Sequence, residues 1–465
     1  MDRRTLIAAG ATAVSLPVLR RFGARGRAAR PAPTPAQLRW QREETALFIH
    51  FGINTFTDRE WGDGTESPSL FGPVALDARQ WARAARAAGA GSLVLTAKHH
   101  DGFCLWPTTT TRHSVASSPW RSGTGDVMQE FVDACRAERL GAGVYLSPWD
   151  RNAPSYGEGD RYDDFYIAQL TELLTRYGPL VEVWFDGANG EGPNGKRQAY
   201  DWPRIHRTVR ALQPEAVIFS DAGPDVRWIG NERGVAGETC WSTIDPGSVP
   251  YPGYDAPGVG EVLQRGHPHG AVWRPGETDV SIRPGWFWHP AEDAKVRSVE
   301  NLVDLHFTSV GRNSKLLLNV PPTREGMLHP ADVQRLQGYG EAIRELYASD
   351  LMASSLSRKA GADRLVDGDR ESWWAPAGTS GSVELEVGRP VGCTVVCLEE
   401  AIRHGQTVEA YRVEARMGGV WREIARGTTI GHRRLHRIEL VAADRVRLTI
   451  ERALDVPRIA RLSLF

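Results

Sequence analysis

The chain has 465 residues, enough for about two to three domains that each bury a core of their own. Its 56 basic and 57 acidic residues leave a net charge of −1, which gives no reason to expect a nucleic acid or an anionic membrane as partner. The 16 tryptophans outnumber the 13 phenylalanines and 11 tyrosines. Core packing explains most tryptophans, but their flat apolar faces and polar N–H also suit stacking on sugar rings.

Residues 1–30 have the pattern of a targeting segment. Arg3 and Arg4 precede a modestly apolar run over residues 7–19, and small residues follow at 24–29, as in a twin-arginine export signal. The apolar run is too short for a membrane span. We therefore expect export to the periplasm or the extracellular space, with a signal anchor as the alternative. Residues 31–39 then read as a proline-containing spacer.

The cysteines do not form the framework of a disulfide-stapled module. They are five in number and scattered: Cys104, Cys135, Cys240, Cys393 and Cys397. Cys393 and Cys397 lie in a strand-like run, where four residues span ~13 Å, which is beyond the reach of a disulfide. We expect free thiols, as in a protein that folds before export.

Residues 40–348 alternate between apolar strand patterns and helical periodicity. Strands are predicted near 46–51, 92–98, 142–148, 180–186, 216–221, 235–241, 278–282 and 315–320. Helices are predicted over 78–88, 127–138, 163–176, 202–212, 294–307 and 330–347. This rhythm predicts an α/β fold, a (β/α)₈ barrel. The sixth strand is the least regular, because Gly234 and Gly237 interrupt it.

The pattern changes in residues 350–465. Helical runs disappear, and short strands with turns between them follow near 382–387, 394–398, 410–416, 437–440, 445–450 and 458–464. This predicts a C-terminal β-sandwich appended to the barrel.

Two predicted strands end on titratable side chains. The apolar run over residues 180–185 stops at Asp186, and Gly187 lets the chain turn there. The run over 92–97 stops at Lys98, His99 and His100. Because the carboxyl ends of parallel barrel strands meet at the face where active sites lie, these groups are candidates for chemistry. The alternative for a single strand is an aspartate that only caps the next turn.

Similar groups follow the other predicted strands, and together they suit a small, neutral, hydroxyl-rich ligand. They are His50, Glu60, Trp61, Trp149, Trp184, Arg227, Glu232, Glu238 and Trp286. A metal is the weaker interpretation, because His99 and His100 point to opposite faces unless the chain bends there. Neither H-x-H nor H-E-x-x-H spacing occurs around them, and we expect no metal and no cofactor.

Four ordered segments resemble the α-L-fucosidases of glycoside hydrolase family 29. They are Phe48-Ile49-His50-Phe51-Gly52, Ala97-Lys98-His99-His100-Asp101-Gly102-Phe103, Val183-Trp184-Phe185-Asp186-Gly187 and Gly230-Asn231-Glu232. The tail resembles the discoidin-like (F5/8 type C) sandwich at residues 366–369 and at Gly405-Gln406. The segment Arg283-Pro284-Gly285-Trp286-Phe287, with the His-Phe-Gly and Gly-Asn-Glu forms, resembles the branch that cleaves α-1,3 and α-1,4 fucosyl links in branched glycans.

The resemblance implies a retaining exo-glycosidase that removes terminal α-L-fucose from a fucosylated glycan. Asp186 would be the nucleophile and Glu232 the acid/base, with Glu238 as the rival for the second role. Whichever of Glu232 and Glu238 is not the acid/base would be a structural carboxylate.

The same resemblance implies the residues that bind the sugar. His50, His99, His100 and Trp184 would hold fucose hydroxyls, the pair Glu60 and Trp61 would lie on the first loop, and Trp149 or Trp286 would pack on the 6-methyl group. Arg227 is a further candidate, with a structural ion pair as its alternative, and Lys98 would hold loops through a salt bridge. Two other classes stay open: an inactive sugar-binding barrel, and a barrel glycosidase for another sugar.

Overall fold

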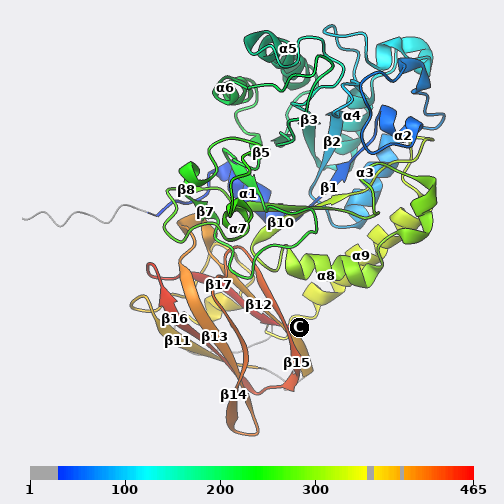
Figure 1. The fold of residues 1–465 in the computed structure, drawn as a ribbon. Coiled ribbons are helices and arrows are strands. Elements are labelled where there is room, and N and C mark those ends of the chain that lie inside the picture. The colour runs from blue at the N-terminus through cyan, green and yellow to red at the C-terminus, as the bar shows by residue number, and fades with distance from the viewer. Residues whose placement is uncertain (1–29, 353–360, 388–391) are drawn as a thin grey trace, which may run out of the picture. The chain divides into compact units, whose positions relative to one another are not determined.

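The computed structural model describes residues 30–352, 361–387 and 392–465. The predicted export signal therefore falls, apart from Arg30, outside the described residues. Eight parallel strands close into a barrel in the order β1-β10-β9-β6-β5-β4-β3-β2 (Figure 1). They are β1 (Thr45–Ile49), β2 (Ser92–Lys98), β3 (Gly141–Leu146), β4 (Glu182–Trp184), β5 (Val217–Ser220), β6 (Val226–Trp228), β9 (Gly276–Ser281) and β10 (Ser314–Asn319). The predicted (β/α)₈ barrel is confirmed.

Helices connect most of the barrel strands, although β6 follows β5 without one. Those foreseen from periodicity are α3 (Ala78–Ala87), α4 (Val127–Glu138), α5 (Asp160–Arg176), α6 (Trp202–Leu212), α8 (Val299–Thr308) and α9 (Pro330–Ala348), and a short α2 (Ile53–Thr57) follows β1. The side chains of Asp77, Asp126 and Asp201 accept hydrogen bonds from backbone N–H groups in the first turns of α3, α4 and α6. Such caps satisfy donors that a helix leaves open, so they fix where these helices begin.

The sixth unit of the barrel differs from the prediction. Residues 235–241 form no strand, and the barrel strand here is β6, which lies ahead of them. Gly234 has φ +71° and packs closely against Leu305 and Val280, a left-handed backbone that a strand does not adopt. Between β6 and β9 the chain makes an excursion that contains β7 (Thr243–Ile244), α7 (Val259–Arg265) and β8 (Val272–Trp273).

The predicted spacer is shorter than expected, because residues from 35 onward form the helix α1 (Pro35–Glu43). The Thr34 side chain accepts a hydrogen bond from the Gln37 backbone N–H, and the Gln37 side chain accepts one from the Thr34 backbone N–H. This capping box starts the helix ahead of its apolar residues. Trp40 of α1 packs with Phe48 and Trp184 in the apolar interior of the barrel.

The C-terminal part is a sandwich of two antiparallel sheets, as predicted. One sheet has the order β11-β16-β13-β14 and the other β15-β12-β17. The strands are β11 (Gly381–Glu386), β12 (Gly392–Glu400), β13 (Val408–Met417), β14 (Val420–Gly427), β15 (Arg434–Ala442), β16 (Arg445–Ala453) and β17 (Ile459–Leu464). Strand β14 was not predicted from the sequence. It lies at a sheet edge and is largely exposed, so it needs few apolar residues and gives a weak strand pattern.

Two further observations concern the whole described chain. All five cysteines are buried, unpaired thiols, which confirms the prediction from their spacing. Within the described ranges, no helix is both long and apolar enough to cross a membrane.

Candidate active site

A cavity of about 640 Å³ opens at the carboxyl ends of the barrel strands. It brings together most of the side chains singled out from the sequence: His50, Glu60, Trp61, His99, His100, Trp184, Asp186, Glu232 and Trp286. They come from loops and strand ends far apart in the chain, as expected for the mouth of a barrel.

Asp186 follows β4 and is held by two donors. The Tyr145 hydroxyl lies 3.0 Å from its Oδ2, and the Ala188 backbone N–H lies 2.7 Å from its Oδ1. His100 Nε2 is 3.8 Å from Oδ2. Burial and the neighbouring Asp186 charge raise the pKa of Tyr145 well above its usual value, so its hydroxyl stays a donor. This arrangement fixes the orientation of a carboxylate that faces the cavity.

Glu232 lies after β6 and lines the same cavity. Burial raises the pKa of its carboxyl group, and the charges of Asp186 and Glu60 raise it further, against a hydrogen bond from Trp286. A carboxyl group with a raised pKa keeps its proton closer to neutral pH, which is what a general acid requires.

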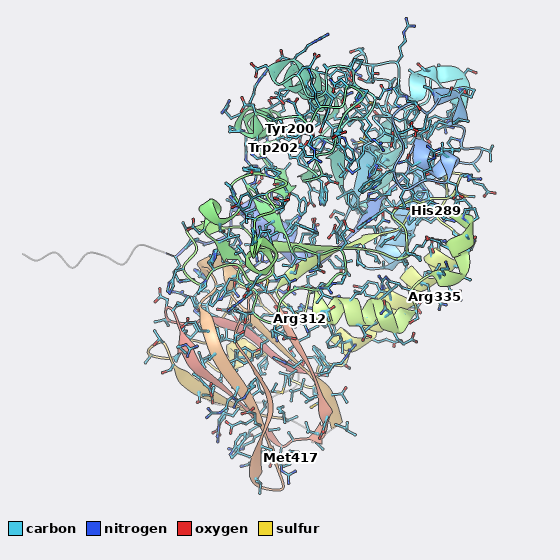
Figure 2. The ribbon with its side chains drawn as sticks, in the orientation of Figure 1. Tyr200, Trp202, His289, Arg312, Arg335 and Met417 are labelled. Atoms are coloured by element: carbon cyan, nitrogen blue, oxygen red, sulfur yellow. The ribbon has the colours of Figure 1, made fainter. Side chains whose placement is uncertain are left out.

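Glu238 does not line this cavity and lies beside the C-terminal sandwich. Its side chain is 65 % exposed, and Oε2 is 2.6 Å from Arg434 of the sandwich. It also pairs with Arg312, which Figure 2 labels where the barrel meets the sandwich. Partial burial raises the pKa of Glu238, but the charges of Arg434 and Arg312 bring it below the usual value. Glu238 therefore lies away from the cavity that Glu232 and Asp186 line.

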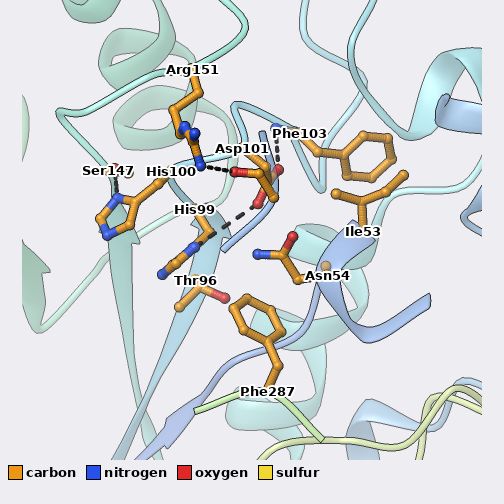
Figure 3. A network of polar contacts seen from close by, with 12 residues as sticks. Ile53, Asn54, Thr96, His99, His100, Asp101, Phe103, Ser147, Arg151 and Phe287 are labelled. Carbon is orange, nitrogen blue, oxygen red and sulfur yellow. Dashed lines mark hydrogen bonds and ion pairs between the residues drawn. The ribbon is translucent and has the colours of Figure 1, made fainter. Parts of the chain in front are cut away.

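Three imidazoles form the floor of the cavity. The chain turns after Lys98, so the rings of His99 and His100 lie side by side, 4.1 Å apart (Figure 3). His100 Nδ1 is 2.7 Å from Ser147 Oγ, and His50 Nδ1 is 2.8 Å from Asn319 Oδ1.

Burial favours the neutral form of all three imidazoles. Burial lowers the pKa of His50 to about 3, and burial with the charges of its two neighbours lowers the pKa of His99 well below its usual value. For His100 burial outweighs the attraction of Asp186, and its pKa is also lowered. Neutral rings exchange hydrogen bonds with hydroxyl groups without placing charge beside a neutral ligand.

The turn at His99 is the bend that a shared metal ion would need. Among the residues that the structure describes, however, no three His, Cys, Asp or Glu side chains are grouped so that they could hold an ion.

Aromatic side chains form the apolar surfaces of the cavity. The Trp184 indole stacks on Phe219 at 4.1 Å and 12°, and its N–H donates to Glu277 at 3.0 Å. Trp61 is 57 % exposed at the rim.

Glu60 connects the first loop to the loop that carries Trp286. It accepts hydrogen bonds from the backbone N–H groups of Trp286, at 2.9 Å, and Phe287, at 3.1 Å, and lies 2.6 Å from His289 Nε2. Glu60 therefore positions the indole of Trp286 beside the cavity.

Two predicted binding residues do not line the cavity. Trp149 is buried behind His100, with 4.8 Å between the rings, and its N–H donates to the Glu191 carbonyl. Arg227 is 0 % exposed and donates to the carbonyl groups of Leu263 and Trp241, each at 2.9 Å. These placements do not support substrate contact, and Arg227 holds backbone carbonyls rather than the ion pair considered as its alternative.

The structural role suggested for Lys98 is confirmed. Its ammonium group is buried and lies 2.8 Å from Asp150 Oδ2. The ion pair ties the end of β2 to the loop after β3.

Sequence reasoning missed two aspartates of the cavity, the buried Asp279 and the half-buried Asp221. Asp279 in β9 accepts a hydrogen bond from Trp228 Nε1 at 2.7 Å, and burial with the charge of Glu232 raises its pKa to about 8. Asp221 after β5 accepts from the Gly253 N–H at 2.8 Å, and burial raises its pKa to about 6. A usable signal for Asp279 was the alternation of Glu277, Asp279 and Ser281 in an otherwise buried strand.

The fold and the site define a barrel glycoside hydrolase, because Asp186 and Glu232 line one cavity together with imidazoles and indoles. The sequence model of the alpha-L-fucosidase family matches residues 40–345. The chain is 41% identical over 451 residues to alpha-L-fucosidase 1 of Arabidopsis thaliana, covering 94% of this chain and 87% of that protein.

Solved structures agree with this match. The crystal structure of SpGH29 is 40% identical with a TM-score of 0.87, over 94% of this chain and 98% of that one. A Ruminococcus gnavus GH29 fucosidase in complex with fucose is 32% identical with a TM-score of 0.83, over 94% and 96%. The chain belongs to the α-L-fucosidases of glycoside hydrolase family 29, and its substrates are fucosylated glycans.

Proposed function

We propose that the protein is a retaining exo-enzyme that releases terminal α-L-fucose through Asp186 and Glu232. The observation that carries this is that both carboxyl groups line one cavity while differing in environment: Asp186 is held by two donors, and Glu232 has a raised pKa.

In this mechanism Glu232 carries out the proton transfers, and Asp186 forms and releases the covalent bond to the sugar. Asp186 attacks the anomeric carbon and forms a glycosyl ester, while Glu232 gives its proton to the leaving oxygen. The Glu232 carboxylate then takes a proton from water, and the resulting hydroxide displaces Asp186. Fucose leaves with its original anomeric configuration, and both carboxyl groups return to their starting states.

The remaining cavity groups bind the sugar. His50, His99 and His100 hold its hydroxyls, with Trp184 as an apolar wall, and Trp61 and Trp286 cover it from the rim. Glu60 acts on the substrate through the loop that it holds in place.

We also propose specificity for α-1,3 and α-1,4 links in branched glycans. A cavity of about 640 Å³ lies well inside the range of pockets for ligands larger than one monosaccharide. Tyr254, Asp255 and Val259 extend its wall beyond the imidazoles and Trp184, and they offer a second sugar polar and apolar contacts.

The expected result is a higher kcat/KM for a Lewis-type trisaccharide than for an aryl fucoside, despite the poorer leaving group. The second sugar of a branched glycan supplies binding energy that positions the scissile bond, and an aryl fucoside lacks it. Initial rates on both substrates and on α-1,2-fucosyl-galactose measure this. Equal or faster cleavage of the aryl compound, or good cleavage of the α-1,2 link, would assign the enzyme a broad specificity.

Two proposals concern the rest of the chain. The pattern Arg3-Arg4 before an apolar run supports export through a twin-arginine signal, and the five unpaired thiols fit a protein that folds before export. Fractionation of expressing cells tests it, since mature protein found only in the cytoplasm would contradict export. The tail is proposed to be discoidin-like, on the strength of its two antiparallel sheets and the motifs named above.

A further inference from the structure

One wall of the cavity comes from residues 239–267, here called the wall segment, which contains β7 and α7. Its residues at the cavity are Gly253, Tyr254, Asp255, Val259, Gly260 and Leu263. The segment follows the sixth barrel strand, where a regular barrel has one longer helix, and contains only the short α7.

The wall segment contacts both loops that carry the proposed catalytic carboxyl groups. A Cβ placed on Gly253 would lie 2.5 Å from the carbonyl oxygen of Gly187, the residue after Asp186. A Cβ placed on Gly230, two residues before Glu232, would lie 3.2 Å from the carbonyl oxygen of Gly260. The segment therefore packs tightly between the two loops, and its position bears on the separation of the carboxyl groups.

The base of the wall segment is held by the sandwich. The Thr429 hydroxyl accepts the backbone N–H of Cys240 at 3.0 Å. Gln406 accepts the backbone N–H of Ser242 at 2.7 Å and donates to the Cys240 carbonyl at 3.1 Å. Thr429 and Gln406 are both buried, so water does not replace these bonds. Figure 1 shows β7, β8 and α7 beside the sandwich strands.

Arg227 joins the base to the wall. Its guanidinium donates to the Trp241 carbonyl at the base and to the Leu263 carbonyl in α7, each at 2.9 Å. Arg227 belongs to β6, the strand that leads to Glu232. One buried side chain therefore links Trp241 to α7, which lies beside Gly230.

We propose that the C-terminal sandwich is a positioning element of the active site, which sets the separation of Asp186 and Glu232 by anchoring the wall segment through Thr429 and Gln406. The inference rests on the proposed roles of those two carboxyl groups. A retaining mechanism requires them ~5 Å apart, and a misplacement of ~1 Å can cost about 100-fold in rate.

The test uses one matched set of variants in the full chain. Thr429→Val keeps the shape of the side chain but removes the acceptor for Cys240, whereas Thr429→Ser keeps the acceptor. Thr407→Val is the control, because Thr407 is a buried sandwich threonine whose hydroxyl donates to Glu400 of the sandwich at 3.0 Å.

We expect Thr429→Val to lower kcat on a fucosylated oligosaccharide about tenfold. The inhibition constant of free fucose should change little, because the imidazoles and Trp184 belong to other strands. Thr429→Ser and Thr407→Val should both keep near wild-type kcat. Amide hydrogen exchange should rise in residues 239–267 for Thr429→Val alone.

Equal kcat and equal exchange in Thr429→Val and Thr407→Val would overturn the inference. If Thr429→Val does not fold, the same measurements on Gln406→Met test the inference. This change removes the hydrogen bonds to Ser242 and Cys240. The exchange result stands apart from the proposed chemistry. Increased exchange in Thr429→Val, together with wild-type kcat in Asp186→Ala or Glu232→Gln, would overturn the proposed function and leave the anchoring in place.

Discussion

Asp186→Ala is expected to abolish turnover while the fold stays intact. A methyl group cannot form the glycosyl ester, and the Tyr145 and Ala188 donors then hold no carboxylate in the cavity. We expect a loss of at least about 100-fold in kcat, or ~3 kcal/mol of barrier. Steady-state rates measure it, beside a thermal melt that shows the variant folded.

Azide provides the matched chemical control for this variant. The small anion can enter the space left by the carboxylate and attack the anomeric carbon, giving a fucosyl azide and partial recovery of rate. An Asp186→Ala enzyme that retains more than about one per cent of wild-type kcat without azide would rule Asp186 out as the nucleophile.

Glu232→Gln is expected to slow glycan substrates far more than activated aryl fucosides. The amide has no proton to give, and only a poor leaving group needs one. The ratio of kcat/KM for an oligosaccharide to that for an activated aryl fucoside should therefore fall by about 100-fold or more. Parallel kinetics on both substrates measure this ratio.

Glu238→Gln is the matched control, since it makes the same change at a carboxylate paired with Arg434 and Arg312. The wild-type rate should fall as pH rises through the raised pKa of Glu232, because the acid loses its proton there. Glu232→Gln should lack this alkaline decline, and Glu238→Gln should keep it. If instead Glu238→Gln shows the leaving-group effect, the two roles are reversed.

Most of the barrel could be predicted because its strands and helices carry local signals. Buried strands such as β2 are mainly apolar and end on polar groups, and helices such as α4 begin at capping side chains. The sixth strand could not be predicted, because β6 has only three residues and one of them is Arg227. The charge of Arg227 is satisfied by carbonyl groups that are distant in the sequence. Helix α1 was missed because prolines at 31, 33 and 35 resemble a spacer, although Pro35 sits where a helix tolerates it.

The site residues that could be placed from the sequence are those that directly follow a predicted strand. Asp186, His99 and His100 follow strands directly, so their placement at the barrel mouth follows from topology. Tyr145 and Asp279 lie inside strands, so a search for polar groups at strand ends passes over them, although the polar alternation in β9 was a usable signal for Asp279. Trp149 or Trp286 was expected at the 6-methyl group, and of the two only Trp286 lines the cavity. The Trp149 N–H donates to the Glu191 carbonyl, a contact between separate loops that sequence does not reveal.

The anomeric configuration of the first-formed fucose tests the central claim most directly. Proton NMR during the early phase of hydrolysis of an α-L-fucoside, before mutarotation, distinguishes the two anomers. Double displacement through Asp186 and Glu232 predicts that α-L-fucose appears first and then equilibrates. Initial release of β-L-fucose would mean a single displacement by water, and would contradict the assignment of Asp186 as a nucleophile.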